Sequence, residues 1–289
     1  MVNTTRPDDR SDNMMSQADS LRAPLVVKIG GRALEGDARA ELAREVAALT
    51  ERLVLVHGGG AEVSEWSARL GIEPRFHDGL RVTDQATLEV AAAVLGGLAN
   101  KRWVALLAAH GVRAAGLCAL DAGIADVAMH RQSARLGAVG EVRAIDTAPL
   151  LALLGAGITP VLAPIGACDG EIVNINADDL AAAVAGALQT PVLVLLSDTP
   201  GLVLDGRVVP RLDPAGLTAA LAHADVTGGM RPKLLAAQRA LDWGAARVII
   251  TAWNGPGTLA ALATGAGTGT TFVHTLTPAF AAASPGGRS

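Results

Sequence analysis

The stretch Leu53–Gly60, Leu-Val-Leu-Val-His-Gly-Gly-Gly, most constrains what this chain can fold into. Four successive apolar residues without alternation predict a strand buried on both faces, as in a parallel sheet. Three glycines end the strand, and Ala61–Leu70 then has helical character. This order places backbone N–H groups and a positive helix end at the carboxyl edge of a sheet, where anionic groups bind. A glycine turn of this kind can also be a plain connection, so its neighbours decide its meaning.

A second strand of the same character precedes it at Leu25–Ile29, which carries Lys28 and leads into Gly30-Gly31. Asp37–Arg52, between the two strands, has apolar residues at helical spacing. The three segments predict a βαβ unit with a right-handed crossover. Both glycine loops would then end at the same edge of the sheet.

Strand and helix patterns alternate along most of the remaining chain, which indicates an α/β fold with a mainly parallel sheet. Asp84 is expected to begin a long helix that reaches His110, with Gly96-Gly97 as a close-packing point or a break. Glu73–Asp84 is polar and is expected to be irregular. The further elements expected are an antiparallel excursion in Asp126–Asp146, a hairpin at Asp205-Gly206, and strands at Val112–Leu117, Ile158–Ile165, Pro191–Leu196, Arg247–Thr251 and Gly269–Val273.

Composition excludes several classes of protein. The formal net charge of −4 and the 2% of aromatic residues argue against a nucleic-acid binder, which needs a basic face or stacking rings. No uninterrupted apolar run approaches the roughly 18 residues that span a bilayer, so we expect no membrane partner. The two cysteines, Cys118 and Cys168, lie far apart without metal-ligand spacing, which is typical of reduced core residues in a cytoplasmic protein.

The chain reads as one domain over residues 24–276. Residues 1–23 are polar and carry no apolar segment of the signal-peptide type, so they are expected to form a disordered tail. Residues 277–289 are expected to form a flexible C-terminal tail.

Lysine is rare in this chain. Of 24 basic residues only three are lysines: Lys28, Lys101 and Lys233. A position that keeps lysine where arginine is the usual cation indicates a need for a compact ammonium group. Lys28 precedes one glycine loop and Lys233 follows Gly228-Gly229, so two ammonium groups could flank a phosphoryl group in transfer. The alternative for Lys28 is a strand-end lysine whose amine reaches solvent.

Three polar side chains alternate in Asn174-Ile-Asn176-Ala-Asp178 before a helix. A strand-to-helix turn and an N-cap are the structural explanations, but three polar groups exceed what one cap needs. We therefore favour a functional site, in which Asp178 orients the lysines or a Mg²⁺ ion. Asp178 is not required as a general base if the acceptor is already a carboxylate. Arg81, in Gly-Leu-Arg-Val-Thr-Asp, is a candidate bidentate clamp for a substrate carboxylate, with a solvated loop arginine as the alternative.

Several motifs are absent from the sequence. The chain has no Gly-x-x-x-x-Gly-Lys-[Ser/Thr] loop, no dinucleotide fingerprint and no Gly-x-Ser-x-Gly elbow. Its six histidines show no metal-ligand spacing, so no protein metal site is expected. A generic dinucleotide oxidoreductase is thereby disfavoured.

The motifs together resemble those of the acetylglutamate kinases, in the amino acid kinase superfamily. They occur in the family's order, over about Leu25 to Val273: Lys28-Ile-Gly-Gly, His57-Gly-Gly-Gly, Gly79-Leu-Arg-Val-Thr-Asp, Asn100-Lys, Val139-Gly-Glu-Val, Asn174-Ile-Asn-Ala-Asp, Leu196-Ser-Asp-Thr-Pro-Gly and Gly228-Gly-Met-Arg-Pro-Lys. The resemblance implies a three-layer α/β/α sandwich and ATP-dependent phosphorylation, with Mg²⁺, of the side-chain carboxylate of N-acetyl-L-glutamate. That reaction is the second step of arginine biosynthesis.

The resemblance also implies roles for individual residues. Lys28 and Lys233 correspond to transition-state stabilisers, and Asp178 to the residue that organises them. The implied substrate-binding residues are Gly59, Gly60, Arg81, Asn174 and Asn176. The implied nucleotide-binding residues are Gly30, Gly31, Ser197, Asp198, Asp225 and Thr227. A substrate lobe at about 24–190 and a nucleotide lobe at 191–276 would meet without a real domain break.

The resemblance leaves alternatives open. A sibling kinase of lysine biosynthesis, which phosphorylates an aminoadipate attached to a carrier protein, fits the stretch Arg81–Arg102 equally well. A non-catalytic nucleotide-binding regulator of the same fold is disfavoured because both lysines and Asp178 are retained. Ala263-Thr-Gly-Ala-Gly-Thr-Gly lacks the acidic residue of arginine-inhibited members, and the N-terminal tail is polar and non-periodic, whereas those members carry an N-terminal amphipathic helix. We therefore expect a homodimer that arginine does not inhibit.

Overall fold

The computed structural model describes residues 23–30, 36–50 and 52–274. Gly31, the predicted C-terminal tail and all of the predicted N-terminal tail except Ala23 lie outside these residues.

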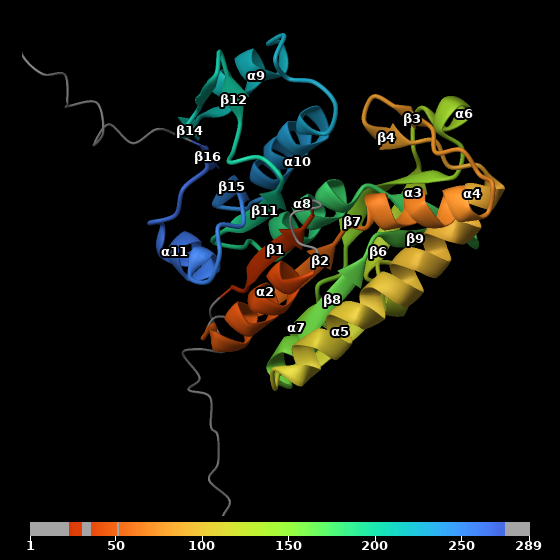
Figure 1. The fold of residues 1–289 in the computed structure, drawn as a ribbon, viewed down its shortest axis with the longest axis horizontal. Coiled ribbons are helices and arrows are strands. Elements are labelled where there is room, and N and C mark those ends of the chain that lie inside the picture. The colour runs from red at the N-terminus through yellow and green to blue at the C-terminus, as the bar shows by residue number, and fades with distance from the viewer. Residues whose placement is uncertain (1–22, 31–35, 51, 275–289) are drawn as a thin grey trace, which may run out of the picture.

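An eight-stranded sheet forms the middle layer of the described chain (Figure 1). Its strands run in the order β14 (Arg211–Leu212), β16 (Thr270–Val273), β15 (Arg247–Ala252), β11 (Leu193–Ser197), β1 (Leu25–Ile29), β2 (Leu53–His57), β8 (Thr159–Ala163) and β5 (Ala114–Cys118). Neighbouring strands are parallel except β15 and β16. The mainly parallel sheet predicted from the sequence is confirmed.

Helices cover both faces of this sheet. One face carries α7 (Ala148–Gly155), α8 (Ala177–Ala187) and α10 (Met230–Asp242), and the other carries α2 (Asp37–Ala48), α5 (Asn100–Ala109) and α11 (Thr258–Thr264). Within β1, Val26 packs into the core under α7, α8 and α10, and Val27 packs into the core under α2, α5 and α11. Both residues are fully buried. The unbroken apolar runs of β1 and β2 are therefore explained by burial on both faces, and the three-layer sandwich is confirmed.

A second sheet has four strands. It runs β6 (Ala125–Met129), β7 (Val139–Ile145), β10 (Glu171–Ile175) and β9 (Ile165–Cys168), with the short η3 (Asp121–Gly123) and α6 (Ser133–Leu136) nearby in sequence. The predicted antiparallel excursion is confirmed by the pairing of β6 with β7. The buried strand predicted over Ile158–Ile165 is confirmed as β8, but it ends at Ala163 and Ile165 begins β9. Pro164, which lacks a backbone N–H, separates β8 from β9, and the two strands belong to different sheets.

One long helical segment joins α4 (Gln85–Ala91), the π-helix η2 (Ala92–Ala99) and α5. Asp84 caps it, accepting a hydrogen bond from the backbone N–H of Thr87 at 3.0 Å. Gly96 is the predicted close-packing point and not a break, because a Cβ there would lie 2.9 Å from Cys118 Sγ.

The helix Gln85–Ala109 is long and apolar enough to cross a membrane, with 44% of its most apolar window buried in the structure. Core helices of globular proteins meet the same criterion, and α5 buries Trp103 and Leu107 against the sheet.

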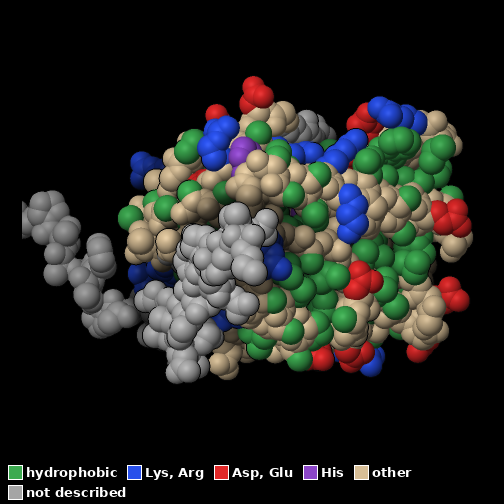
Figure 2. All heavy atoms as spheres, turned by 90° about the horizontal axis from the view of Figure 1, so that it is seen from below, with side chains coloured by type: hydrophobic (Ala, Val, Ile, Leu, Met, Phe, Trp, Pro, Cys, Tyr) green, Lys and Arg blue, Asp and Glu red, His purple; other side chains and the backbone are tan. Residues whose placement is uncertain are grey.

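Figure 2 shows hydrophobic side chains gathered on the half of one face that lies away from the grey residues.

Two small hairpins stand on opposite sides of the molecule in Figure 1. β12 (Val203–Leu204) and β13 (Arg207–Val208), beside α9 (Pro214–Leu221), form the predicted Asp205-Gly206 hairpin. β3 (Phe76–His77) and β4 (Leu80–Arg81) form a hairpin within the segment expected to be irregular, after α3 (Gly60–Arg69). This second hairpin places Arg81 beside the carboxyl ends of β1 and β2.

Candidate active site

Three charged side chains from three elements meet at the carboxyl end of β1. Asp178 on α8 holds Lys28 Nζ of β1 at 2.7 Å through Oδ1 and Lys233 Nζ of α10 at 3.1 Å through Oδ2. All three are largely buried, with side-chain exposures of 7% for Lys28 and Asp178 and 16% for Lys233. The sequence predicted these residues as one catalytic group, and the structure brings them together.

Burial and mutual attraction set the pKa values of this group in opposite directions. Burial lowers the pKa of Lys28, a shift that the neighbouring Asp178 carboxylate opposes and the charge of Lys233 reinforces. Burial would raise the pKa of Asp178, but the two ammonium groups outweigh it and hold that pKa below its usual value. The carboxylate is therefore ionised and serves as a fixed anion between two cations.

Two glycine loops lie side by side above this group. Ile29 and His57 are paired at the ends of β1 and β2, and Gly58 N–H donates to the Ile29 carbonyl at 2.8 Å. A Cβ at Gly30 would lie 2.2 Å from Lys28 Nζ, so only glycine leaves room for the amine at that place. A Cβ at Gly59 would lie 2.7 Å from Leu95 Cδ2, so the loop also packs closely against η2. The predicted convergence of the two loops is confirmed for the residues that the structure describes.

Arg81 faces these loops from the β3–β4 hairpin. Its Nη2 donates to the Gly60 carbonyl and to Ser64 Oγ, each at 2.7 Å, and its Cζ lies 4.7 Å from the centre of the Phe76 ring. Its Nη1 is buried and has no hydrogen-bond partner. Burial lowers the pKa of Arg81, and the guanidinium nevertheless stays protonated at neutral pH, as arginine does in proteins. A buried guanidinium with a free donor is suited to an anionic group of a ligand.

Asn174 and Asn176, the two asparagines before α8, make different hydrogen bonds. Asn176 Oδ1 accepts from the backbone N–H groups of Asp178 and Asp179 at 2.9 and 3.0 Å, so it is the N-cap of α8. Asn174 Nδ2 donates to Thr83 Oγ1 at 3.3 Å. Both side chains border a pocket of about 210 Å³, whose lining also includes Lys28, Gly30, Gly59, Gly60, Arg81 and Asp178.

The predicted nucleotide residues are less closely grouped. Ser197 ends β11 and is 9% exposed, and Asp198 lies near enough to Lys28 for its charge to oppose the lowering of that pKa. Asp225 and Thr227 lie in the connection before α10 and do not line the pocket that contains Lys28. Asp225 accepts from the backbone N–H of Asp205 and forms, with Asp205 and His223, an exposed cluster whose ligand-type atoms lie within 4.8 Å of one another.

Comparison with known proteins identifies the family of this chain. Residues 23–252 match the amino acid kinase family. The chain belongs to that family. A protein of Chloroflexus aurantiacus named acetylglutamate kinase is 44% identical over 253 residues, covering 86% of this chain and 96% of the relative. One of Methanopyrus kandleri with the same name is 42% identical and covers 80% and 95%.

Solved structures resemble this amino acid kinase over most of its length. The smu.665 protein of Streptococcus mutans aligns with a TM-score of 0.72 and 27% identity, covering 88% of this chain and 99% of that one. An N-acetylglutamate synthase of Neisseria gonorrhoeae, complexed with coenzyme A and N-acetyl-glutamate, aligns with a TM-score of 0.75 and 28% identity. This chain covers 61% of the synthase.

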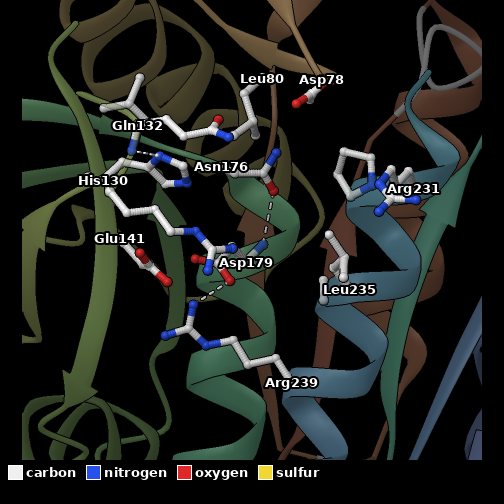
Figure 3. Close-up of a pocket in the computed structure, with 15 residues that line it drawn as sticks. Asp78, Leu80, His130, Gln132, Glu141, Asn176, Asp179, Arg231, Leu235 and Arg239 are labelled. Atoms are coloured by element: carbon white, nitrogen blue, oxygen red, sulfur yellow. Dashed lines mark hydrogen bonds and ion pairs between the residues drawn. The ribbon is translucent and has the colours of Figure 1, made fainter. Parts of the chain in front are cut away.

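The structure adds contacts that sequence reasoning missed in this amino acid kinase. His57 Nδ1 lies 2.8 Å from the Gly58 carbonyl, and His57 Nε2 lies 3.2 Å from Asn100 Nδ2. Asp179 and Arg239 form an ion pair of 2.5 Å between α8 and α10 (Figure 3). The motifs His57-Gly-Gly-Gly and Asn100-Lys offered a signal for the first contact. No pattern marked the second.

Proposed function

We propose that this chain transfers the γ-phosphoryl group of ATP to the γ-carboxylate of N-acetyl-L-glutamate, which forms N-acetyl-L-glutamyl 5-phosphate in arginine biosynthesis. The relatives named acetylglutamate kinase support the reaction and the substrate. The observation that carries the proposal is the Asp178 carboxylate, which bridges Lys28 and Lys233 at the floor of a pocket that also presents Arg81.

The bridged lysines fit the charge changes of phosphoryl transfer. A γ-carboxylate oxygen would bond to the γ-phosphorus of ATP while the bond to the β,γ-bridging oxygen breaks, and ADP would leave with that electron pair. Negative charge spreads over the equatorial, attacking and leaving oxygens in this step. Two fixed ammonium groups and the N–H groups of the glycine loops stabilise that charge without reorganising. The acceptor is already ionised, so Asp178 removes no proton and instead holds both lysines in place.

The remaining pocket residues would bind the acceptor. Arg81 has a buried, unpartnered Nη1, which supports a hydrogen bond to a carboxylate of acetylglutamate. Gly59, Gly60, Asn174 and Asn176 would complete this substrate site. The pocket volume of about 210 Å³ suits a small acceptor.

The nucleotide would approach from the side of β11 and α10. Gly30, Gly31, Ser197, Asp198, Asp225 and Thr227 are its proposed contacts, and Mg²⁺ would arrive as part of the Mg-ATP complex. The positive N-terminal end of α10 and Lys233 in its first turn support the placement of phosphates there. The substrate lobe at 24–190 and the nucleotide lobe at 191–276 would thus each bind one reactant.

An acyl-phosphate assay tests the proposal. The purified protein is incubated with Mg-ATP and N-acetyl-L-glutamate, and acyl phosphate is trapped with hydroxylamine. Hydroxamate that requires the acetylated substrate, with glutamate, aspartate and free aminoadipate inactive, is the expected result. No product from folded protein that binds ATP would overturn the proposal. Addition of an aminoadipyl carrier protein would then distinguish the sibling kinase from a silent regulator.

We also propose a cytoplasmic homodimer that arginine does not inhibit and that needs no nucleic-acid or membrane partner. The apolar surface in Figure 2 supports a second copy of the chain as a partner. Light scattering after size exclusion should give twice the chain mass of 29.2 kDa. An arginine titration of the hydroxamate assay should leave the rate unchanged, and strong inhibition would contradict this part of the proposal.

A further inference from the structure

Arg239 joins three parts of the molecule from the last turn of α10. One guanidinium nitrogen, Nη1, donates to Asp179 Oδ1 on α8 at 2.5 Å, and the other, Nη2, donates to the Val142 carbonyl on β7. The Arg239 guanidinium carbon also lies 4.4 Å from the centre of the Trp243 ring, one turn further along α10. Figure 3 shows Arg239 and Asp179 pointing toward each other across the space between the two helices.

The Asp179–Arg239 pair joins the same two helices, α8 and α10, as the Asp178–Lys233 pair of the active site. Asp178 and Asp179 are adjacent on α8, and Asn176 caps the backbone N–H of both. Their partners, Lys233 and Arg239, both lie on α10. The two ion pairs therefore hold the same two helices together. Only the first can touch the reacting groups, because the second faces a different cavity, of about 360 Å³.

The two helices also touch through their backbones. A Cβ at Gly186 of α8 would lie 2.3 Å from Trp243 Cβ and 3.2 Å from the Trp243 carbonyl oxygen, so α10 lies directly against α8 at that end. The Gly186–Trp243 contact and the Asp179–Arg239 pair then fix α10 at two points along α8. Lys233 lies beyond the second point, toward the N-terminus of α10, where the neighbouring Pro232 packs against the β3–β4 turn: a Cβ at Gly79 would lie 2.9 Å from Pro232 Cγ.

We propose that Arg239 and Asp179 are positioning residues for the kinase reaction, which act by holding α10 in the place where Lys233 meets Asp178. This inference rests on the proposed function. Its reason is geometric: small displacements of a catalytic group lower rates strongly, by up to about 100-fold for a shift of 1 Å. Arginine suits the task because its planar fork bonds a carboxylate and a carbonyl at once, which lysine does not.

Steady-state kinetics of Arg239→Ala provides the first test. We expect kcat to fall by about 10- to 100-fold, while the KM for acetylglutamate stays near the wild-type value because Arg81 and Asn174 are untouched. Arg239→Lys keeps the charge opposite Asp179 but loses one of the two bonds, so it should be intermediate. Arg131→Ala is the matched control, since Arg131 lines the same cavity and makes none of these contacts. Activity in wild type and in Arg131→Ala establishes the kinase reaction independently of the fate of Arg239.

A double-mutant cycle with Lys233 separates positioning from a general loss of stability. If Arg239 acts through Lys233, adding Arg239→Ala to the Lys233→Ala variant should change kcat by less than about threefold. The same substitution in the wild-type protein should lower kcat much more. Independent losses that multiply would overturn the proposal. Because Arg239 faces an open cavity, added guanidinium chloride at low millimolar concentration should raise kcat of Arg239→Ala, and sodium chloride at equal ionic strength should not.

The small number of lysines allows a readout that does not depend on turnover. Protein labelled with ¹⁵N-lysine carries only Lys28, Lys101 and Lys233 as side-chain probes. The NMR signal of the Lys233 side chain is assigned by its loss in Lys233→Ala. In Arg239→Ala the chemical shift of this signal should change. The Lys101 signal should stay, because Lys101 binds the Gly116 carbonyl on the far side of the sheet from α10. An unshifted Lys233 signal together with a wild-type kcat would overturn the inference.

Discussion

At the scale of single residues, the proposed catalysis depends on two ammonium groups that share one carboxylate. In Lys233→Ala, Asp178 retains its partner Lys28 but loses the partner of its Oδ2, and the proposed transition state loses one of its two cations. We expect kcat to fall by roughly 100- to 1000-fold, as when one oxyanion donor is removed, with a much smaller change in ATP affinity. Hydroxamate kinetics and calorimetric ATP titration measure the two effects. Lys101→Ala is the control, and an unchanged kcat in Lys233→Ala would remove this lysine from the mechanism.

His57 gives the protein a pH-dependent stability of predictable sign. The Gly58 carbonyl can only accept, so Nδ1 carries the proton and Nε2 accepts from Asn100. Burial lowers the pKa of His57 from 6.5 to about 4. Between these two values the unfolded chain binds the extra proton, so the free energy of unfolding decreases as the pH falls from about 6.5 to 4. The decrease is about 1.4 kcal/mol per pH unit and about 3 kcal/mol in all.

Denaturant unfolding at several pH values, compared between wild type and His57→Gln, isolates this contribution from those of other titrating groups. The difference between the two free energies should be flat above pH 7 and should decline below about pH 6.5. A difference that stays constant down to pH 4.5 would show that His57 is not held neutral in the folded protein.

At the scale of elements, the start of α8 combines a structural and a chemical task. Asn176 caps two backbone N–H groups, one of which belongs to Asp178 itself. Asn176→Ala should therefore cost about 0.5–2 kcal/mol of stability and also lower kcat, because the first turn of α8 holds the carboxylate between the lysines. Asn176→Ser retains a capping oxygen and should recover most of the stability. Urea unfolding and the hydroxamate assay give the two readouts. An alanine variant with normal stability and normal kcat would contradict both tasks.

The same elements explain how much the sequence could predict. Lys28, Gly30 and Gly58–Gly60 were predictable because each belongs to a strand and loop whose residues are contiguous in the chain. Arg239 was not, since its partners Asp179 and Val142 are 60 and 97 residues away, and nothing local distinguishes it from other helical arginines. The β3–β4 hairpin was also missed, because strands of two residues are too short to show alternation. Pattern reasoning therefore found the floor of the pocket and missed contacts that depend on how helices pack.

At the scale of the whole molecule, the two predicted lobes share one sheet and the two cores that cover its faces. β1 of the substrate lobe pairs with β11 of the nucleotide lobe, and a single core cluster contains Val26, Val54 and Ile250. Neither lobe can expose its half of this core without the other. We therefore expect thermal unfolding as one cooperative transition, in spite of the division near residue 190.

If the protein unfolds in a single transition, each ligand stabilises the whole molecule. If the lobes unfolded separately, each ligand would stabilise only the lobe that binds it. Acetylglutamate and a non-hydrolysable ATP analogue, each present at 100 times its dissociation constant, should each stabilise the whole protein by about 2.7 kcal/mol. Both ligands would then raise the same melting temperature, by amounts that add if their sites are independent. Arg81→Ala should abolish the shift with acetylglutamate and keep the shift with the nucleotide analogue. Scanning calorimetry that resolves two transitions, each moved by one ligand only, would show that the lobes unfold separately although β1 and β11 are paired.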